Sequence, residues 1–402
     1  MKKILVLAII LRFLLMPFFF HPDIKTYNFQ SSFLKHGVIN IYPYLLENRE
    51  KLPLKEEFVY FPLAYFSVGA YQIVASPFLG DEFAGWLADA SGGAIENINL
   101  FRYLFILKLP YLFFDILIAF TLMQFFKNIR DKKKVFALWL LNPFTPVLIY
   151  VFSNIDVIPA ALVLLGLAAM RKKKVIGASL LLAVASGFKA YPILFFPFLF
   201  VKAENIKAKL LALAAFVGSL GLIVFPFWSK AFAASSFASG LTTRILEAAI
   251  AISGGEKILI IPLALIVLFL FSFYAKKKIG LWRYCLAAVL IVVPLIHFHI
   301  QWLLWAAPFL AIVRVKKNKL SWLLLTMAVS AFAIPFLYND KFMSVSLLSP
   351  INTWFALIPT PFAIVQRFAD PYLVQSLIHS LLVGSSLALI WQILERPSNE
   401  QF

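Results

Sequence analysis

Charged residues are scarce in this sequence. Asp, Glu, Lys and Arg make up 14% of its 402 residues, against roughly a quarter in an average soluble domain. Apolar residues make up 62%, which excludes an ordinary soluble protein and predicts an integral membrane protein. Because the apolar runs recur along the whole length, we expect one polytopic domain over residues 1–402 rather than a soluble domain with an anchor.

Cysteine is rarer still, because the chain contains one. This residue, Cys285, lies within an apolar run. The sequence therefore excludes an intrachain disulfide and a metal site built from several thiolates.

Acidic residues are also few, with 19 against 37 basic residues and a net charge of +18. In a soluble protein this charge would favour a nucleic-acid partner. Here the basic residues form short clusters between apolar runs, such as KNIRDKKK at 127–134 and RKKK at 171–174. Such clusters are typical of cytosolic loops, so the membrane is predicted as the partner and nucleic acid is not.

The order of apolar and polar stretches predicts an all-α membrane protein with about 10–12 transmembrane helices. Residues 3–20 follow Lys2 and Lys3 and lack a small-residue cleavage site, so they are predicted to remain as the first helix. Residues 21–100 then form a long outer loop. Its apolar part, 58–79, is predicted to lie along or dip into the outer interface, since parity with the basic clusters leaves it no crossing. Both termini are predicted in the cytosol.

Two hairpins are predicted to bring polar residues to the outer face. Residues 175–201 begin and end beside basic clusters, so they form a shallow hairpin with Lys189 and Tyr191 at its tip. The turn HFHIQ, which contains His297 and His299, joins two later apolar runs.

The first apolar run ends in FFFHPDIKTYNF, which contains Asp23. An acid at this boundary between membrane and water is wet enough to ionise and close enough to reach the head of a lipid. The simpler interpretation is that Asp23 caps or terminates the helix.

Four further ionisable residues interrupt or end apolar runs, where a charge is expensive unless it meets water or a partner. Lys108 and Asp115 lie seven apart, on one helix face, and they could form a structural pair that eases the burial of both charges. Asp156 could be the N-cap of the next helix. Lys189 could bind a phosphate at the outer interface or extend its amine to water.

His297 and His299 lie two apart, a spacing that gives weak support for shared metal ligation. No HExxH, CxxC or DxD motif lies in an outer segment, so neither a metal nor another cofactor is predicted. Each His could equally be an interfacial hydrogen-bonding residue, and Trp302 and Trp305 are expected in the aromatic belt.

Six segments together resemble the GT-C superfamily of glycosyltransferases that use polyprenyl-phosphate sugars. Within it they are most similar to the mannosyltransferases of phosphatidylinositol-mannoside and GPI-anchor synthesis. The resemblance covers roughly residues 15–310. The segments are HPD ending at Asp23, YFPLAYF at 60–66, KLPYLFFD at 108–115, LNPFTPVLIYVFSNID at 141–156, GFKAYPILFFP at 187–197 and HFHIQWLLWAAP at 297–308.

The resemblance implies a GT-C-like fold and a role for each matching residue. Asp23 matches the general base, Lys189 a contact to the phosphate of the sugar donor, and either His297 or His299 a residue near that donor. Asp156 and Tyr191 would help to bind the sugar donor, and the supporting residues would be Lys108, Asp115 and Tyr60. Ser153 and Asn154 stand where the family often has Gly-Gln before the acid of Asp156, which leaves its role open.

The function predicted is an inverting glycosyltransferase that moves a hexose, with mannose as first candidate, from a polyprenyl phosphate to a lipid or glycan acceptor at the outer face. The membrane would be the cell membrane in a prokaryote or the ER in a eukaryote. One alternative is a transporter or lipid flippase, and another is a glycan polymerase or ligase. A polymerase would favour grouped outer arginines for a diphosphate, and the sequence groups none of them.

Overall fold

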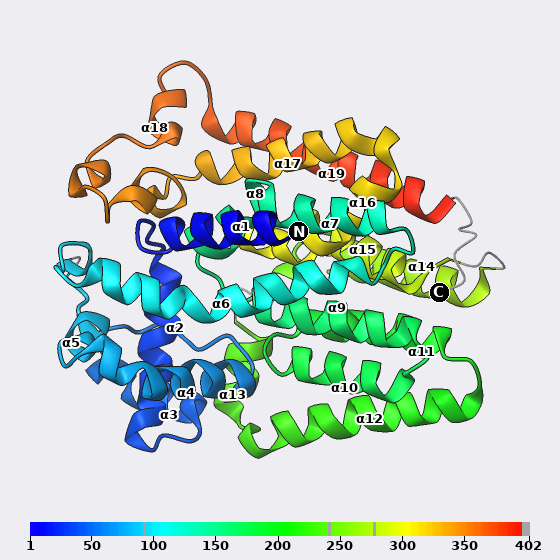
Figure 1. Ribbon diagram of the computed structural model, residues 1–402, viewed down its shortest axis with the longest axis horizontal. Helices are drawn as coiled ribbons and strands as arrows, with labels where there is room; N and C mark the ends of the chain where they lie inside the picture. Colours follow the sequence, from blue (N-terminus) through cyan, green and yellow to red (C-terminus); the bar gives the residue numbers. More distant parts are fainter. Residues whose placement is uncertain (92, 240–242, 276–278, 396–402) are drawn as a thin grey trace.

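The structure is a computed structural model, and it describes residues 1–91, 93–239, 243–275 and 279–395. Almost all regular structure in these residues is helical (Figure 1). The only sheet among them is the antiparallel pair β1 (Ala249–Ala251) and β2 (Lys257–Leu259). The predicted all-α class is confirmed.

Four helices of the described chain are long and apolar enough to cross a membrane, and a fifth span is formed if one bent pair counts as one. A helix of 24 residues is about 36 Å long, enough for a hydrocarbon core of about 30 Å. The bent pair turns by 48° at Asn142 and Pro143. The long helices are α6 (Leu100–Met123), α12 (Ile206–Val224), α17 (Ser321–Phe336) and α19 (Pro371–Glu395), and the bent pair joins α7 (Ile129–Leu141) to α8 (Phe144–Pro146) and the π-helix η4 (Val147–Val151).

Several shorter apolar helices pack among the long ones. The predicted hairpin at 175–201 is present as two short arms, and its turn contains Lys189. The predicted count of about ten to twelve spans depends on these short helices and stays a prediction. They are α9 (Val157–Arg171), α10 (Val175–Ser186), η5 (Tyr191–Phe195) with α11 (Phe196–Lys202), α14 (Ile260–Tyr274) and α15 (Leu281–Val292).

The first helix is shorter than predicted. It was expected to reach residue 20, but α1 (Lys2–Leu15) ends just before Pro17. Met16 still has helical φ and ψ, whereas Pro17 has no N–H with which to continue the helical hydrogen bonds. The chain then starts α2 (Pro22–Ser32), with Pro22 at its first position, where the missing N–H costs no hydrogen bond. Asp23 thus lies in the first turn of α2, not at the end of α1.

The predicted outer loop contains short helices that pack around α2. Helix α4 (Pro62–Leu79) contacts α2 and α6 and is not among the four long apolar helices. Gly69 permits the approach of α4 to α2, since a Cβ there would lie 2.7 Å from the Ser31 carbonyl oxygen. The other helices of this region are η1 (Phe33–His36), α3 (Ile41–Asn48) and α5 (Phe83–Ala88).

The remaining helices complete the bundle. The main 3-10 helix of the candidate site is η9 (Ile300–Trp305), which runs into α16 (Ala307–Lys316). Further short helices include α13 (Lys230–Phe237), η7 (Thr243–Leu246) and α18 (Pro361–Val365).

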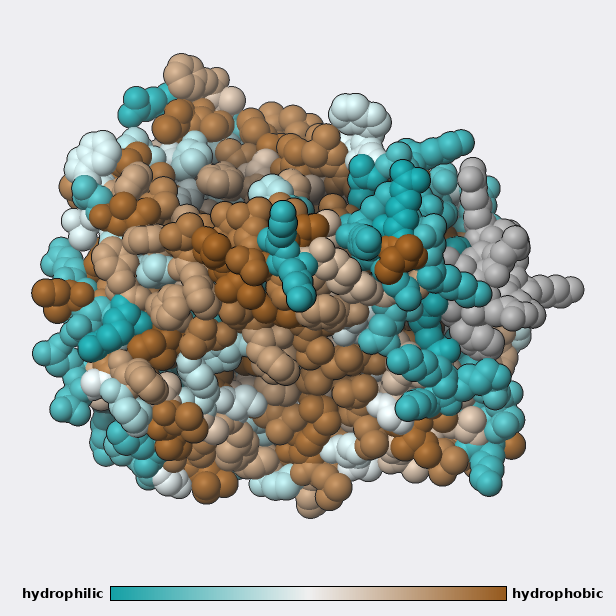
Figure 2. Space-filling view, viewed as in Figure 1, coloured by the Kyte–Doolittle hydropathy of each residue, from teal (hydrophilic) through white to brown (hydrophobic). Residues whose placement is uncertain are grey.

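The two ends of the bundle differ in composition. Hydrophilic side chains gather on the right of Figure 2, where α7, α9 and α16 begin or end in Figure 1. Two basic clusters of the sequence, 127–134 and 171–174, lie there. The chain is an integral multi-pass protein, and which membrane face this end meets stays a prediction.

Candidate functional site

Five segments that are far apart in the sequence meet near the start of α2. They are the first turn of α2, the strand-like segment before α4, the turn between η4 and α9, the turn between α10 and η5, and the start of η9. These segments contain Asp23, Tyr60, Asp156, Lys189 and Gln301. The structure therefore brings most of the predicted site residues together.

Asp23 is the most exposed member of this cluster, with 43% of its side chain accessible. Its Oδ2 accepts a hydrogen bond from Gln301 Nε2 at 2.8 Å. His21 Nδ1 accepts the backbone N–H of Asp23 at 3.3 Å. A negative side chain in the first turn also meets the positive end of the helix dipole. Asp23 is thus oriented by the hydrogen bond to one of its carboxylate oxygens, and its side chain remains accessible to water.

Asp156 is almost fully buried and forms the anionic half of an ion pair. Lys189 Nζ lies 2.9 Å from both of its carboxylate oxygens, and Trp305 Nε1 donates to Oδ2 at 2.7 Å. Asp156 occupies the N-cap position of α9, but its side chain caps no helical N–H. The capping interpretation is therefore wrong for this side chain, because Lys189 and Trp305 take both oxygens.

Aromatic rings surround the ammonium group of Lys189. Its Nζ lies 5.2 Å from the centroid of the Tyr60 ring and 5.3 Å from that of Trp305, distances at which a cation is attracted to a ring face. Tyr191 stacks on Trp305 with centroids 4.2 Å apart. The side chain of Lys189 remains 19% exposed, so the cation is held in place but reachable.

Tyr60 lies between the two carboxylates. Burial of its ring, followed by the negative charges of Asp23 and Asp156, raises the pKa of Tyr60 well above its usual value. Tyr60 is therefore a neutral phenol that can donate a hydrogen bond.

Arg244 and His299 add a second basic group. Arg244 Nη1 lies 2.9 Å from His299 Nε2. Burial of the ring and then the charge of Arg244 lower the pKa of His299 from 6.5 to about 4, so the imidazole is neutral at pH 7 and Arg244 donates to it. Asp23 and Lys189 act on the same pKa, which places His299 beside them. No signal in the sequence indicates that Arg244 lies beside His299.

His297 points to a different neighbour. Its ring stacks on Tyr338 with centroids 5.1 Å apart, and burial followed by Arg244 lowers its pKa. Of the two histidines left open by the sequence, His299 is the one beside Asp23 and Lys189.

The titration of His299 gives a testable prediction. In the unfolded chain His299 takes up a proton near pH 6.5, whereas the folded state resists until about pH 4. Its contribution to stability is therefore complete above pH 6.5 and is lost as the pH falls towards 4. NMR of ring-labelled histidine, assigned with His299→Gln, should show this late titration, and Arg244→Gln should raise the pKa. Titration near 6.5 in the wild type would contradict the burial of this ring.

Lys108 and Asp115 do not form the predicted pair. Lys108 Nζ donates to the carbonyl oxygens of Met16 at 2.8 Å and Phe19 at 2.5 Å. Those carbonyls follow the point at which α1 ends, where backbone acceptors lack helical partners. Lys108 therefore secures the chain between α1 and the turn that carries Asp23. The pairing expected from one helix face was wrong because this unwound segment competes for the amine.

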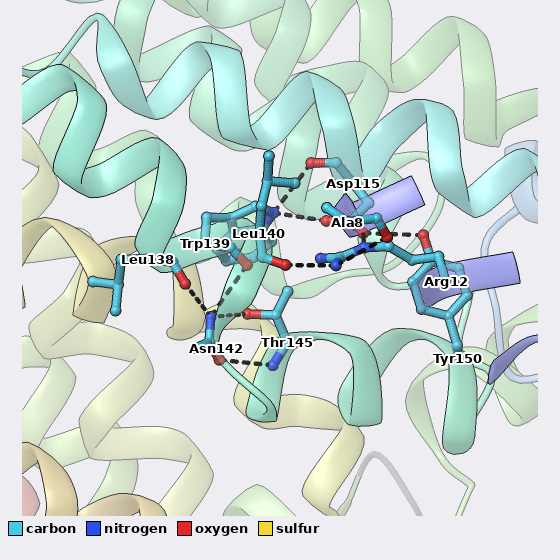
Figure 3. Close-up of polar contacts among 9 residues, drawn as sticks. All are labelled: Ala8, Arg12, Asp115, Leu138, Trp139, Leu140, Asn142, Thr145 and Tyr150. Atoms are coloured by element: carbon cyan, nitrogen blue, oxygen red, sulfur yellow. Dashed lines mark hydrogen bonds and ion pairs between the residues drawn. The ribbon is translucent and has the colours of Figure 1, made fainter. Parts of the chain in front are cut away.

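Asp115 pairs instead with Arg12 of α1, as Figure 3 shows. Arg12 Nε lies 2.9 Å from Asp115 Oδ2. Trp139 Nε1 donates to Oδ1 at 2.7 Å and the Tyr150 hydroxyl to Oδ2 at 3.0 Å. Arg12 Nη1 also donates to the Leu140 carbonyl at 2.5 Å. This buried cluster joins α1, α6, α7 and η4. Arg12 and Asp115 are therefore part of a structural network that holds these four elements together.

The turn that carries Asp156 has an unusual backbone. Ser153 has φ of +52°, the left-handed region that side chains other than Gly rarely adopt. The Tyr27 hydroxyl, itself bonded to the Tyr111 hydroxyl, donates to the Ser153 carbonyl at 3.1 Å, and Asn154 Oδ1 accepts the N–H of Asp156 at 2.9 Å. Strained backbone of this kind often occurs at functional sites.

Three residues of the site were missed by the sequence analysis. Trp305 was expected in the aromatic belt but is buried against Asp156, and Gln301 and Arg244 received no role. Gln301 gave one local signal, because it is a buried amide in an otherwise apolar run. Across the residues that the structure describes, no three His, Cys, Asp or Glu side chains gather as a metal site would require.

A family model resembles the central part of the chain. The model of a family described as GPI transamidase subunit PIG-U matches residues 73–295, more than half of the chain. No curated protein matches the chain.

Proposed function

Since the chain belongs to the family of the GPI transamidase subunit PIG-U, a family of multi-pass membrane proteins, we propose that it acts on a membrane glycolipid. The specific proposal is an inverting glycosyltransferase that moves a hexose, with mannose as first candidate, from a polyprenyl phosphate to a lipid or glycan hydroxyl. The observation that carries it is the convergence of an exposed carboxylate, Asp23, with the basic groups of Lys189 and Arg244.

Asp23 is proposed as the general base. Sugar transfer breaks the bond between the anomeric carbon and the phosphate oxygen, and the electron pair leaves with the phosphate. The acceptor oxygen forms the new bond from the opposite face, which inverts the anomeric centre, and its proton passes to the Asp23 carboxylate. Gln301 donates to Oδ2, so Oδ1 is the oxygen proposed to take the proton. A positioned base contributes roughly 10²–10⁴ in rate.

Lys189 and Arg244 are proposed to stabilise the leaving phosphate. Preorganised cations lower the barrier most where negative charge develops during the reaction. Asp156 holds Lys189 by two hydrogen bonds. Neutral His299 accepts one hydrogen bond from Arg244 and so orients its guanidinium. In this proposal Asp156 and His299 are positioning residues, while Tyr60 and Tyr191 shape the space beside Lys189. No cofactor is required.

The topology is part of the same proposal. Residues 1–402 would act as one unit, with both termini in the cytosol and the site at the outer face. That face would be the cell exterior in a prokaryote or the ER lumen in a eukaryote.

The family description favours a second candidate function. A subunit of a GPI transamidase would bind the glycolipid without moving a sugar, and the same polar cluster would then hold its phosphate and glycan. A transporter or lipid flippase remains the alternative outside these two glycolipid functions.

The two candidates differ in the product. Purified protein in liposomes is incubated with radiolabelled polyprenyl-phosphate mannose and a lipid extract as acceptor. A transferase should yield labelled glycolipid whose new linkage has the anomeric configuration opposite to that of the donor. Binding of a GPI glycolipid with no transfer would support the subunit function, and movement of the unmodified labelled donor from one leaflet of the liposome to the other would support a lipid flippase.

A further inference from the structure

An apolar groove of about 240 Å³ runs between α7, α16 and α17. Leu138 of α7, Leu310 of α16 and Leu324 and Phe332 of α17 are among the side chains that form its walls. It begins near Leu303 of η9 and follows α16 away from the candidate site. The groove is thus lined mainly by apolar side chains of three neighbouring helices.

The polar side chains in the groove wall are largely occupied with each other. Asn142 Nδ2 donates to Thr145 Oγ1 at 2.6 Å and to the Leu138 carbonyl at 2.6 Å (Figure 3). The Thr145 N–H in turn donates to Asn142 Oδ1 at 3.0 Å. Because these groups satisfy one another, an apolar occupant leaves none of them without a partner.

One charged side chain lines the groove. This residue, Arg314, lies in the last turn of α16, at the end of the groove remote from the candidate site. Its Nη1 donates to Asn318 Oδ1, and a guanidinium has further N–H groups for another acceptor. A planar guanidinium also suits phosphate, which it can bind through two parallel hydrogen bonds.

The surroundings of Arg314 favour an anionic occupant. Hydrophilic side chains cover this end of the bundle in Figure 2, and exposed basic residues there include Lys133, Lys172 and Lys319. Basic groups beside an apolar surface attract lipids with anionic heads.

We propose that this groove binds an anionic phospholipid, with its phosphate at Arg314 and one acyl chain along α16. The argument uses an apolar wall, internally satisfied polar groups, one cation at the mouth and a basic surface around it. It does not depend on sugar transfer, and the lipid head lies at the end opposite Asp23.

The test is native mass spectrometry of the purified full chain with equimolar phosphatidylglycerol and phosphatidylcholine of identical acyl chains. The wild type should retain phosphatidylglycerol at least fivefold more than phosphatidylcholine. Arg314→Gln should abolish this preference, and Ala328→Phe, which fills the groove from α17, should reduce retention of both lipids. Lys257→Gln, which removes an exposed cation in β2 away from the groove wall, is the matched control and should resemble the wild type.

Equal retention of the two lipids by the wild type would overturn the proposal, as would unchanged retention in Ala328→Phe. A third arm adds polyprenyl phosphate. If it displaces phosphatidylglycerol from the wild type and binds equally well to Arg314→Gln, the groove holds the tail of a sugar donor and the proposal is wrong. Absence of sugar transfer would leave the lipid result unchanged, so the failure of one proposal is distinct from the failure of the other.

Discussion

Replacing Asp23 by Asn is expected to lower the rate of sugar transfer by about 10²–10⁴, because Asn cannot take the proton of the acceptor hydroxyl. The amide oxygen can still accept the hydrogen bond from Gln301 Nε2, so the fold and the binding of the sugar donor should be preserved. The expected signature is a reduced kcat with little change in KM. It is measured with labelled polyprenyl-phosphate mannose in liposomes.

The matched control is Glu256→Gln, which removes an exposed acid in the turn between β1 and β2 and should leave transfer unchanged. Gln301→Met keeps the carboxylate but removes the hydrogen bond that orients it, so a smaller loss of transfer is expected. If Asp23→Asn retains full activity while the wild type transfers mannose, Asp23 is not the general base.

The largest effect on stability is expected from Asp115→Leu, at about 3–5 kcal/mol. The substitution leaves the buried guanidinium of Arg12 without its ion-pair partner, and it also removes the acceptor of Trp139 and Tyr150. Removing one half of a buried ion pair costs more than the pair itself contributes, since the remaining charge stays desolvated. Thermal unfolding in detergent, followed by circular dichroism, measures the loss.

The double variant Arg12→Met with Asp115→Leu tests this cause. Because no charge is left unpaired, it should be more stable than Asp115→Leu alone. Arg130→Met is the control, since Arg130 is exposed near the start of α7 and should change stability by less than about 0.5 kcal/mol. A double variant less stable than Asp115→Leu would show that the unpaired guanidinium is not the source of the loss.

Much of the architecture could be predicted because it depends on local patterns. Apolar runs and basic clusters repeat on the scale of a helix, so they locate the helices and group the basic ends. The hairpin at 175–201 and the turn at Asp156 were recognisable for the same reason. Lys189 and Asp156 were both singled out, because a charge next to an apolar run needs a partner.

The pairings could not be predicted because they join distant segments. Lys108 and Asp115 share one face of α6, yet they bind different partners. Asp115 binds Arg12 of α1, and Lys108 binds a carbonyl group of the chain just after α1, which ends before Pro17. Arg12 received no role from the sequence. In the same way, Gln301 and Arg244 show their roles only once folding brings them to Asp23 and His299.

The short 3-10 helix η9 has a further consequence for substrate selection. In η9, Gln301 binds Asp23 and Trp305 binds Asp156, which holds Lys189. The distance between the Asp23 carboxylate, the proposed proton acceptor, and the Lys189 ammonium, proposed to bind the phosphate, is therefore set by η9 before any substrate binds. We expect such a site to select its sugar by size. A sugar ring that spans the distance between the two groups contacts both, and a smaller ring does not.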